Sequence, residues 1–274
     1  MFQNIKRTYL LKLRSAIIIV SFALLLFVIG CNTRVEGCLD IAAANFDLDA
    51  DRDCDGCCTY PTISISLSQK WNDRNFSTTD TLVDVQGDMF KIVDLQYYLS
   101  SWLWSDVGSQ HFTVDSADIA CNGGLLRYTP DILVVETRQF VYTLGTMRTS
   151  PLIDSVHLVF GLHPSLDCVD ASSSSTPAVL SDNVSLWDES LSSRATVRLV
   201  LQRDLANEIK DTLYIHTFQN LGLAYDLGLK PGINTTLNLT VNYALWFENA
   251  DIQDLDSFEA SILSGIKGSI FKTP

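Results

Sequence analysis

The sequence predicts an all-β protein, an antiparallel β-sandwich with a C-terminal covering helix and an N-terminal disulfide-rich segment. Three observations predict this fold class. From Thr62 onward, short runs of β-branched and aromatic residues recur between turns of Gly, Asn, Asp and Ser. A helical spacing of apolar residues is clear only near the C-terminus. Four of the cysteines lie together between residues 37 and 61.

The N-terminus has the layout of a secretory signal. Basic residues precede an uncharged apolar run from Ala16 to Ile29, which is too short for an ordinary membrane-spanning helix. The run ends in FVIGC, where Gly30 precedes Cys31, the pattern read by a lipoprotein signal peptidase. We therefore expect residues 1–30 to be a signal peptide and Cys31 to be the lipidated residue of a bacterial envelope lipoprotein. A buried apolar helix is the competing interpretation.

The charge balance bears on partners. Four of the 19 basic residues precede Cys31, which leaves 15 against 32 acidic residues, or a net charge of about −17 after removal of the signal. Nucleic acid is not an expected partner, because phosphate binding needs a basic face. We expect the membrane, reached through the lipid anchor and most simply the outer membrane, as one partner and an envelope protein as a candidate second.

The remaining cysteines form an even set, which in an exported chain favours three disulfides. They are Cys38, Cys54, Cys57, Cys58, Cys121 and Cys168. Because Cys57 and Cys58 are adjacent, we expect different partners for them, with one tying the opening segment to Cys121 or Cys168. Zinc or thiol redox chemistry at Cys54-x-x-Cys57 is the alternative, although no second CxxC pair follows.

An alternating run of acidic residues lies in the same segment. The five are Asp47, Asp49, Asp51, Asp53 and Asp55. Oxygen ligands at alternate positions before a glycine, here Gly56, suit the first half of a calcium loop. The position of the bidentate glutamate holds Thr62, so a complete EF-hand is excluded. Calcium binding and a solvated acidic linker are the two alternatives. The stretch GCLDIAAANFDLDAD resembles short modules of exported Bacteroidetes proteins.

The main domain is expected to span residues 62–274, after a Cys/Asp-rich linker module over residues 31–61. TISISLSQKW alternates apolar and polar residues, as a half-buried strand does. Further strands are expected over residues 90–104, 131–137, 139–144, 154–162, 195–202, 211–218 and 234–243. Residues 170–183 have low complexity and are expected to form a loop. Residues 251–271 space Leu255, Phe258, Ile262 and Ile266 as a covering helix does.

The order of these segments resembles the MbnP-like family of bacterial copper-associated lipoproteins, over roughly residues 62–271. The motifs that carry the resemblance are FKIVDLQYYLSSWLW, DSVHLVFGLHPSLD, LWDESLSSRATVRLVLQ and DTLYIHTF. The resemblance implies a β-sandwich and copper binding by histidines together with an oxidised tryptophan from a Trp-x-His stretch. No Trp-x-His occurs here. Trp187 and His216 match a tryptophan and a histidine of the family's strands.

The histidines are the candidate copper ligands, because imidazole is the usual nitrogen ligand for this metal. His216 leads, together with His157 or His163. The last two lie six residues apart and would share one face of a strand that stayed regular through Gly161. The competing interpretation is that these histidines are hydrogen-bonded to neighbours in the core or in turns.

The function expected from these observations is binding rather than catalysis. The sequence contains no G-x-S-x-G, H-E-x-x-H, P-loop or dinucleotide glycine pattern. Copper handling at the cell envelope is the first hypothesis. The alternative is a structural or adhesion lipoprotein with a calcium-stiffened N-terminal module and no copper site. Tyr97, Tyr98, Trp102 and Trp104 are a candidate sugar or partner platform, but most are expected to face the core.

Overall fold

The structure is a computed structural model that describes residues 34–273, apart from 107–108, 112–115, 130, 151, 174–175, 183–184 and 225–228. The expected signal peptide and Cys31 lie outside these residues. The chain divides into two compact units, which the following paragraphs describe separately. Within the described residues, one unit comprises residues 34–39 and 47–57, and the other comprises residues 40–46 and 58–273.

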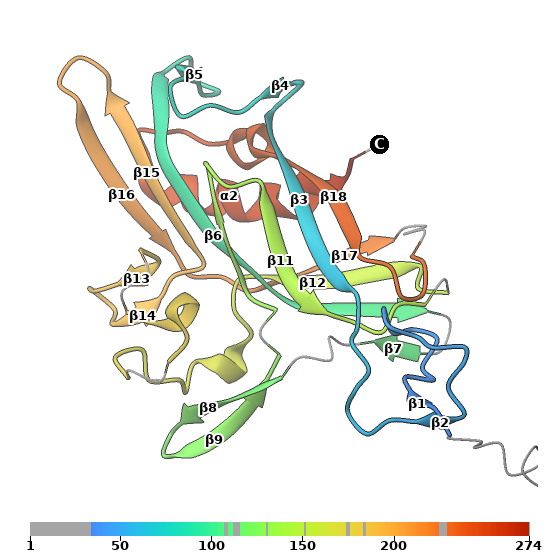
Figure 1. The fold of residues 1–274 in the computed structure, drawn as a ribbon. Coiled ribbons are helices and arrows are strands. Elements are labelled where there is room, and N and C mark those ends of the chain that lie inside the picture. The colour runs from blue at the N-terminus through green and yellow to red at the C-terminus, as the bar shows by residue number, and fades with distance from the viewer. Residues whose placement is uncertain are drawn as a thin grey trace, which may run out of the picture. The chain divides into compact units, whose positions relative to one another are not determined.

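The larger unit is a β-sandwich of two sheets, as predicted (Figure 1). The first sheet has eight strands. Five of them lie side by side in the order β16 (Ile209–Ile215), β15 (Val197–Asp204), β6 (Met89–Asp106), β12 (Ser155–Phe160) and β17 (Gln219–Ala224). The other three pair with the long strand β6: β5 (Leu82–Val83), β7 (Ser109–His111) and β10 (Leu133–Glu136). The second has five strands, β11 (Val141–Thr146), β3 (Thr62–Trp71), β18 (Thr235–Asn242) and β19 (Ile270–Lys272), with β4 (Arg74–Asn75) paired to β3. Side chains from both sheets form one hydrophobic core.

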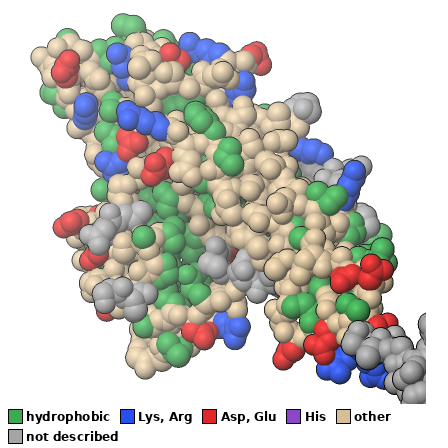
Figure 2. Space-filling model, in the orientation of Figure 1, with side chains coloured by type: hydrophobic (Ala, Val, Ile, Leu, Met, Phe, Trp, Pro, Cys, Tyr) green, Lys and Arg blue, Asp and Glu red, His purple; other side chains and the backbone are tan. Residues whose placement is uncertain are grey.

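Strand β3 shows how the sequence pattern sets the two faces of the smaller sheet. Ile63, Ile65 and Leu67 are 0–1% exposed, whereas the serines between them are half-buried on the outer face. The alternation of period two places the apolar set inward, as predicted. Figure 2 shows few charged side chains over β3, β11 and β18, because short polar residues fill their outward positions.

Strand β6 is buried on both faces over part of its length. The adjacent residues Tyr97 and Tyr98 are both 0% exposed, although they point to opposite sides of the sheet. Tyr97 belongs to the core between the sheets, and Tyr98 to a second cluster on the outer side. Trp102 and Trp104 are also buried. The expectation that most of these four aromatics are buried is therefore confirmed, and the alternative of an exposed platform is wrong.

The outer cluster is covered by segments inserted between the sheet strands. These include the hairpin of β8 (Ala117–Cys121) and β9 (Gly124–Tyr128), the pair β13 (Trp187–Asp188) and β14 (Ser193–Arg194), and the 3₁₀ helices η1 (Pro164–Leu166) and η2 (Ala178–Leu180). Ile119, Leu166 and Leu180 lie in the same cluster as Tyr98. These segments form the walls of the cavities described below.

One strand pairing of the sandwich departs from the predicted antiparallel pattern. Strand β18 pairs with β3 in parallel, from Thr235 opposite Ile63 to Asn242 opposite Lys70. The periodicity of an amphipathic strand is the same in either direction, so the sequence pattern does not reveal which way a neighbour runs.

The C-terminal segment forms the helix α2 (Leu255–Ser269), as predicted, and then the short strand β19, which was not predicted. Phe258, Ile262 and Ile266 of α2 are 0% exposed and pack in the shared core. Gly265 lies against the 3₁₀ helix η3 (Tyr243–Phe247), where an added Cβ would overlap the carbonyl oxygen of Leu245. None of the helices among the described residues is long and apolar enough to span a membrane.

All six cysteines of the described chain are disulfide-bonded, which is typical of proteins of an oxidising compartment. Cys54 bonds to Cys57 and Cys121 bonds to Cys168, while Cys38 and Cys58 are bonded as well. The prediction that Cys57 or Cys58 reaches Cys121 or Cys168 is wrong, because Cys121 and Cys168 are joined across the β8–β9 hairpin and the turn after η1.

The smaller unit is held by backbone pairing and aspartate caps. Strands β1 (Glu36–Gly37) and β2 (Arg52–Asp53) pair in parallel. The carboxylate of Asp51 accepts from the amide of Val35 at 3.2 Å, and that of Asp53 accepts from the amide of Leu39 at 3.3 Å. These bonds satisfy amide groups that the short strands leave unpaired.

Candidate functional site

The cleft around His216

A cleft of about 530 Å³ opens beside the outer cluster of the larger unit. Three segments line it: the turn around η1, the β13–β14 pair and the connection from β16 to β17. Trp187, Arg194, His216 and Phe218 are its largest side chains. Trp187 begins β13, Arg194 ends β14, and His216 follows β16 directly. The strands hold these three side chains in place outside the hydrophobic core.

His216 is the first residue after β16, which ends at Ile215 rather than continuing to Phe218 as predicted. Its Nε2 lies 3.0 Å from Oδ2 of Asp188, whose side chain is 7% exposed. The other oxygen of Asp188 accepts from the amide and the hydroxyl of Ser190. The hydroxyl of Ser190, followed by the ring of His216, holds the pKa of the Asp188 carboxyl below its ordinary value.

This contact determines which ring nitrogen of His216 can bind a ligand. A carboxylate accepts hydrogen bonds, so Nε2 of His216 is the protonated nitrogen. In the neutral ring, Nδ1 then carries the lone pair. A carboxylate that orients a histidine in this way is the usual outer partner of a metal-binding imidazole. Asp188 was not singled out from the sequence, where its only signal was its place after Trp187.

The backbone around His216 is fixed by a close approach of three segments. The hydroxyl of Thr196 donates to the carbonyl of Thr217, and the Thr196 hydroxyl oxygen accepts from the Thr217 amide at 3.2 Å. Gly161 has φ +111°, and a Cβ there would lie 2.8 Å from the Thr217 carbonyl oxygen. A glycine is therefore required where the end of β12 passes the residue after His216.

Arg194 and Trp187 form the opposite wall. They are partners in the β13–β14 pair, and the guanidinium carbon of Arg194 lies 5.9 Å from the centre of the Trp187 ring. Arg194 donates to the carbonyl groups of Leu180 and Val169 at 2.7 and 3.0 Å. Burial lowers the pKa of this guanidinium from its ordinary value. The wall is thus rigid, because both of these bonds go to backbone.

The other predicted site residues

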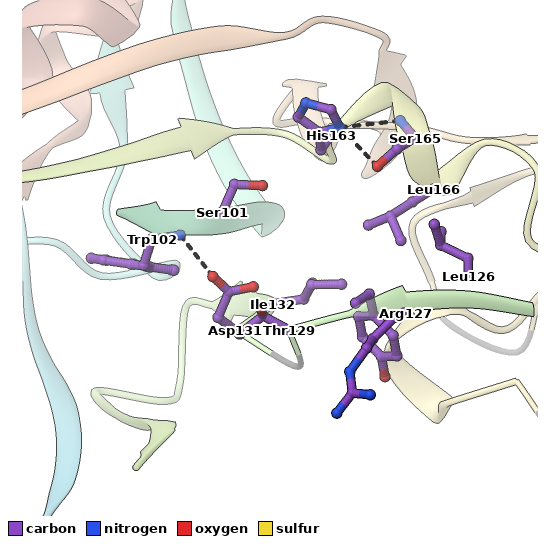
Figure 3. Close-up of a pocket in the computed structure, with 11 residues that line it drawn as sticks. Ser101, Trp102, Leu126, Arg127, Thr129, Asp131, Ile132, His163, Ser165 and Leu166 are labelled. Atoms are coloured by element: carbon purple, nitrogen blue, oxygen red, sulfur yellow. Dashed lines mark hydrogen bonds between the residues drawn. The ribbon is translucent and has the colours of Figure 1, made fainter. Parts of the chain in front are cut away.

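His163 lies in the turn that begins η1 and lines a separate, smaller pocket (Figure 3). Its Nδ1 accepts from the amide of Ser165 at 3.2 Å and lies 2.8 Å from the Ser165 hydroxyl, and its ring meets Phe218 edge-on with centres 5.9 Å apart. Because Nδ1 accepts, the proton of the neutral ring sits on Nε2, and no lone pair is left for a metal. His163 is therefore arranged as a helix cap.

His157 lies within β12 with its side chain exposed, opposite Leu103 on β6 and Gly222 on β17. Its ring packs over Gly222, where an added Cβ would lie 3.1 Å from Nδ1. Strand β12 ends at Phe160, so His157 and His163 do not share one regular strand. His157 does not line the cleft of His216.

The predicted calcium ligands are distributed along the smaller unit. No three of the five aspartate side chains there bring their oxygens within 4.8 Å of one another in the described chain. Asp47 accepts from the amide of Asp49 at 2.9 Å, and Asp51 and Asp53 cap the strand segment as described above. Cys54 and Cys57 are joined to each other, so they offer no thiolate for zinc. Calcium in this unit stays a prediction.

A further group of three carboxylates, Asp84, Asp88 and Asp251, has oxygens within 4.8 Å of one another and was not singled out from the sequence. Asp84 is 8% exposed and accepts from the amides of Gln86, Asp88 and Ile252 at 2.8–3.1 Å. These bonds shape the turn between β5 and β6 and attach it to the segment before α2. These hydrogen bonds account for the burial of Asp84 without a bound ion.

Comparison with known proteins

Neither the models of protein families nor the curated proteins include a match to this chain. Among solved structures, the chain is similar to MbnP from Methylosinus trichosporium, with a TM-score of 0.46 and 10% sequence identity over 70% of this chain and 78% of that chain. A similarity of this size carries no statement about function. Membership of the MbnP-like family therefore stays a prediction from the sequence.

Proposed function

We propose that this chain is a binding protein of the cell envelope, not an enzyme, and that it binds a transition-metal ion, copper in the first instance, at His216. The observation that carries the proposal is the hydrogen bond from His216 to Asp188, because it directs the lone pair of Nδ1 away from the carboxylate. Imidazole nitrogen suits copper, and Cu(II) accepts nitrogen and oxygen ligands together. With His216 as the single histidine that lines this cleft, cleft oxygens and water complete the coordination.

The test is the copper content of the full-length chain purified in detergent without a histidine tag, equilibrated with Cu(II) and then desalted. We expect about one equivalent in the unaltered chain and none in His216→Ala. His157→Ala is the matched control, since it removes an exposed histidine outside the cleft and should keep its copper. Asp188→Asn should weaken copper binding about tenfold or more, as loss of an outer partner does. Equal copper in the unaltered chain and His216→Ala would exclude the site.

Electron paramagnetic resonance of the Cu(II) form adds an independent readout. One imidazole ligand should give hyperfine coupling to a single nitrogen, and this coupling should vanish in His216→Ala while it persists in His157→Ala. Copper that binds without nitrogen coupling would place the ion elsewhere on the acidic surface.

A structural or adhesion lipoprotein remains the second candidate function, and the smaller unit favours it. A disulfide and aspartate caps stiffen that unit. Calcium content measured in the same samples separates the two functions. Calcium without copper, unchanged in His216→Ala, would favour the structural role.

A further inference from the structure

A second cavity of the larger unit contains a buried acid that the proposed function does not use. This pocket of about 200 Å³ lies between β6, the end of β9, the start of β10 and η1. Figure 3 shows Asp131 on one side of it and His163 with Ser165 on the other. Asp131 is 6% exposed. A carboxylate this deeply buried calls for a physical explanation.

Part of the explanation is an irregularity in β6. The pairing with β12 shifts between His157, opposite Leu103, and Val159, opposite Ser100, so Ser101 and Trp102 form a bulge. Ser101 has φ +54°, which is uncommon for a residue other than glycine. The bulge turns the amide of Trp102 away from the sheet, and the carboxylate of Asp131 accepts from it at 2.8 Å.

A hydrogen bond from an amide does not neutralise the negative charge of the Asp131 carboxylate. Among the described residues, no lysine, arginine or histidine forms an ion pair with Asp131. Arg127, which lines the same pocket, instead donates from Nε and Nη2 to the hydroxyl of Ser116 at 3.1 and 2.6 Å. Burial raises the pKa of Asp131 to about 6, although the amides of Trp102, Asp131 and Ser101 oppose the rise. At neutral pH the pocket therefore holds a carboxylate without a counter-ion.

The remaining walls combine apolar and aromatic side chains with the polar side chains of Ser101, Arg127, Thr129, His163 and Ser165. Leu126, Ile132 and Leu166 line the pocket together with the aromatic rings of Trp102 and Tyr128. In Figure 3 one carboxylate oxygen of Asp131 meets the amide of Trp102, and the other lies on the side of Ile132. Pockets for small organic ligands likewise combine apolar and aromatic walls with oriented polar groups.

We propose that this pocket binds a primary alkylammonium group, with the ammonium paired to the Asp131 carboxylate and the alkyl chain against the leucine, isoleucine and aromatic walls. A metal ion fits less well, because hard cations need several oxygen ligands and Asp131 is the sole carboxylate in this lining. An ammonium needs one strong acceptor, and aromatic rings add cation–π attraction. A free amine and the side chain of a lysine share this chemistry.

The test is calorimetric titration of the full-length chain in detergent at pH 7.5. The probe is n-butylammonium chloride, and n-butanol is the uncharged control. We expect saturable binding of one butylammonium and at least tenfold weaker binding of butanol. Asp131→Asn should weaken butylammonium binding at least tenfold, whereas Asp118→Asn, which removes an exposed acid on β8, should leave it unchanged.

A second variant separates loss of the site from loss of the fold. Leu126→Trp places bulk at a half-buried position of the wall, keeps Asp131, and should abolish binding while the denaturation midpoint stays near that of the unaltered chain. Nα-acetyl-lysine methylamide distinguishes the two sources: binding as tight as that of butylammonium points to a lysine side chain, and much weaker binding points to a free amine. The proposal is overturned if butylammonium does not bind, if butanol binds equally, or if Asp131→Asn binds as the unaltered chain does.

Discussion

Asp131 should make the stability of this protein fall as the pH rises. The change to make is Asp131→Asn, which removes the charge and keeps an oxygen that can accept from the Trp102 amide. Burial raises the pKa of Asp131 from 3.8 to about 6 in the folded chain. A folded-state pKa above the unfolded one means that the folded chain binds the proton more tightly between these two values. The free energy of unfolding therefore decreases as the pH rises through this window.

The magnitude follows from the shift. Each pKa unit corresponds to 1.36 kcal/mol, so ionisation of Asp131 should lower the stability of the unaltered chain by about 3 kcal/mol in total, from well below pH 3.8 to above pH 7. Asp131→Asn lacks this contribution, but every other charged side chain, including Arg127 in the same pocket, is present in both proteins. The difference in unfolding free energy between them isolates Asp131, whatever the substitution does to stability at one pH.

The assay is urea denaturation followed by tryptophan fluorescence at pH 4, 5, 6, 7 and 8. Asp131→Asn should gain stability relative to the unaltered chain as the pH rises, by about 2.5 kcal/mol across the series, with most of the change between pH 4 and 6. Asp118→Asn, an exposed acid on the adjacent hairpin, should give a curve parallel to that of the unaltered chain. If the curve of Asp131→Asn is also parallel to that of the unaltered chain, the reasoning that ionisation of the buried Asp131 carboxyl lowers the free energy of unfolding is refuted.

Three further predictions concern packing and covalent links. Gly265→Ala should destabilise by about 3 kcal/mol, because its Cβ would overlap a backbone oxygen, whereas Gly268→Ala on the same helix meets open space and should stabilise by up to about 1 kcal/mol. Replacing Cys121 and Cys168 together by serine should cost about 4 kcal/mol, since their sequence separation is 47 residues; an unchanged urea midpoint would show that the loop is already constrained. Asp84→Ala leaves the amides of a buried turn unpaired and should cost about 3 kcal/mol, measured in the same way; a loss below that of a surface substitution would contradict the role of this carboxylate.

The sequence predicts strand positions well where one face is buried. The alternation over residues 62–71 leads directly to β3, and the spacing of Phe258, Ile262 and Ile266 leads to α2. The sequence pattern does not predict burial where contacts between distant segments determine it. Tyr98 is buried because inserted segments cover the outer face of β6, and no local pattern contains that information.

The sites follow the same rule. His216 could be proposed as a candidate from its residue type and the family resemblance, but its partner Asp188 lies 28 residues earlier, on a two-residue strand. Asp131 stands before an apolar run in the sequence, and only the bulge in β6, 29 residues earlier, explains its burial. Spacing along the chain therefore identifies single chemical groups, whereas their hydrogen-bond partners depend on the fold.

The parallel pairing of β3 with β18 also bears on when this protein can fold. Strand β3 starts the larger sandwich, yet the neighbour that runs beside it over eight residue pairs is among the last strands to be synthesised. The amide of Thr62 also donates to Oδ1 of Asn234, which lies 172 residues later. Contacts this distant form slowly, because a long loop must close before they contribute. Until the C-terminal strands emerge, β3 presents an open edge. The smaller sheet can therefore be completed only at the end of synthesis, when β18 and β19 are available to pair.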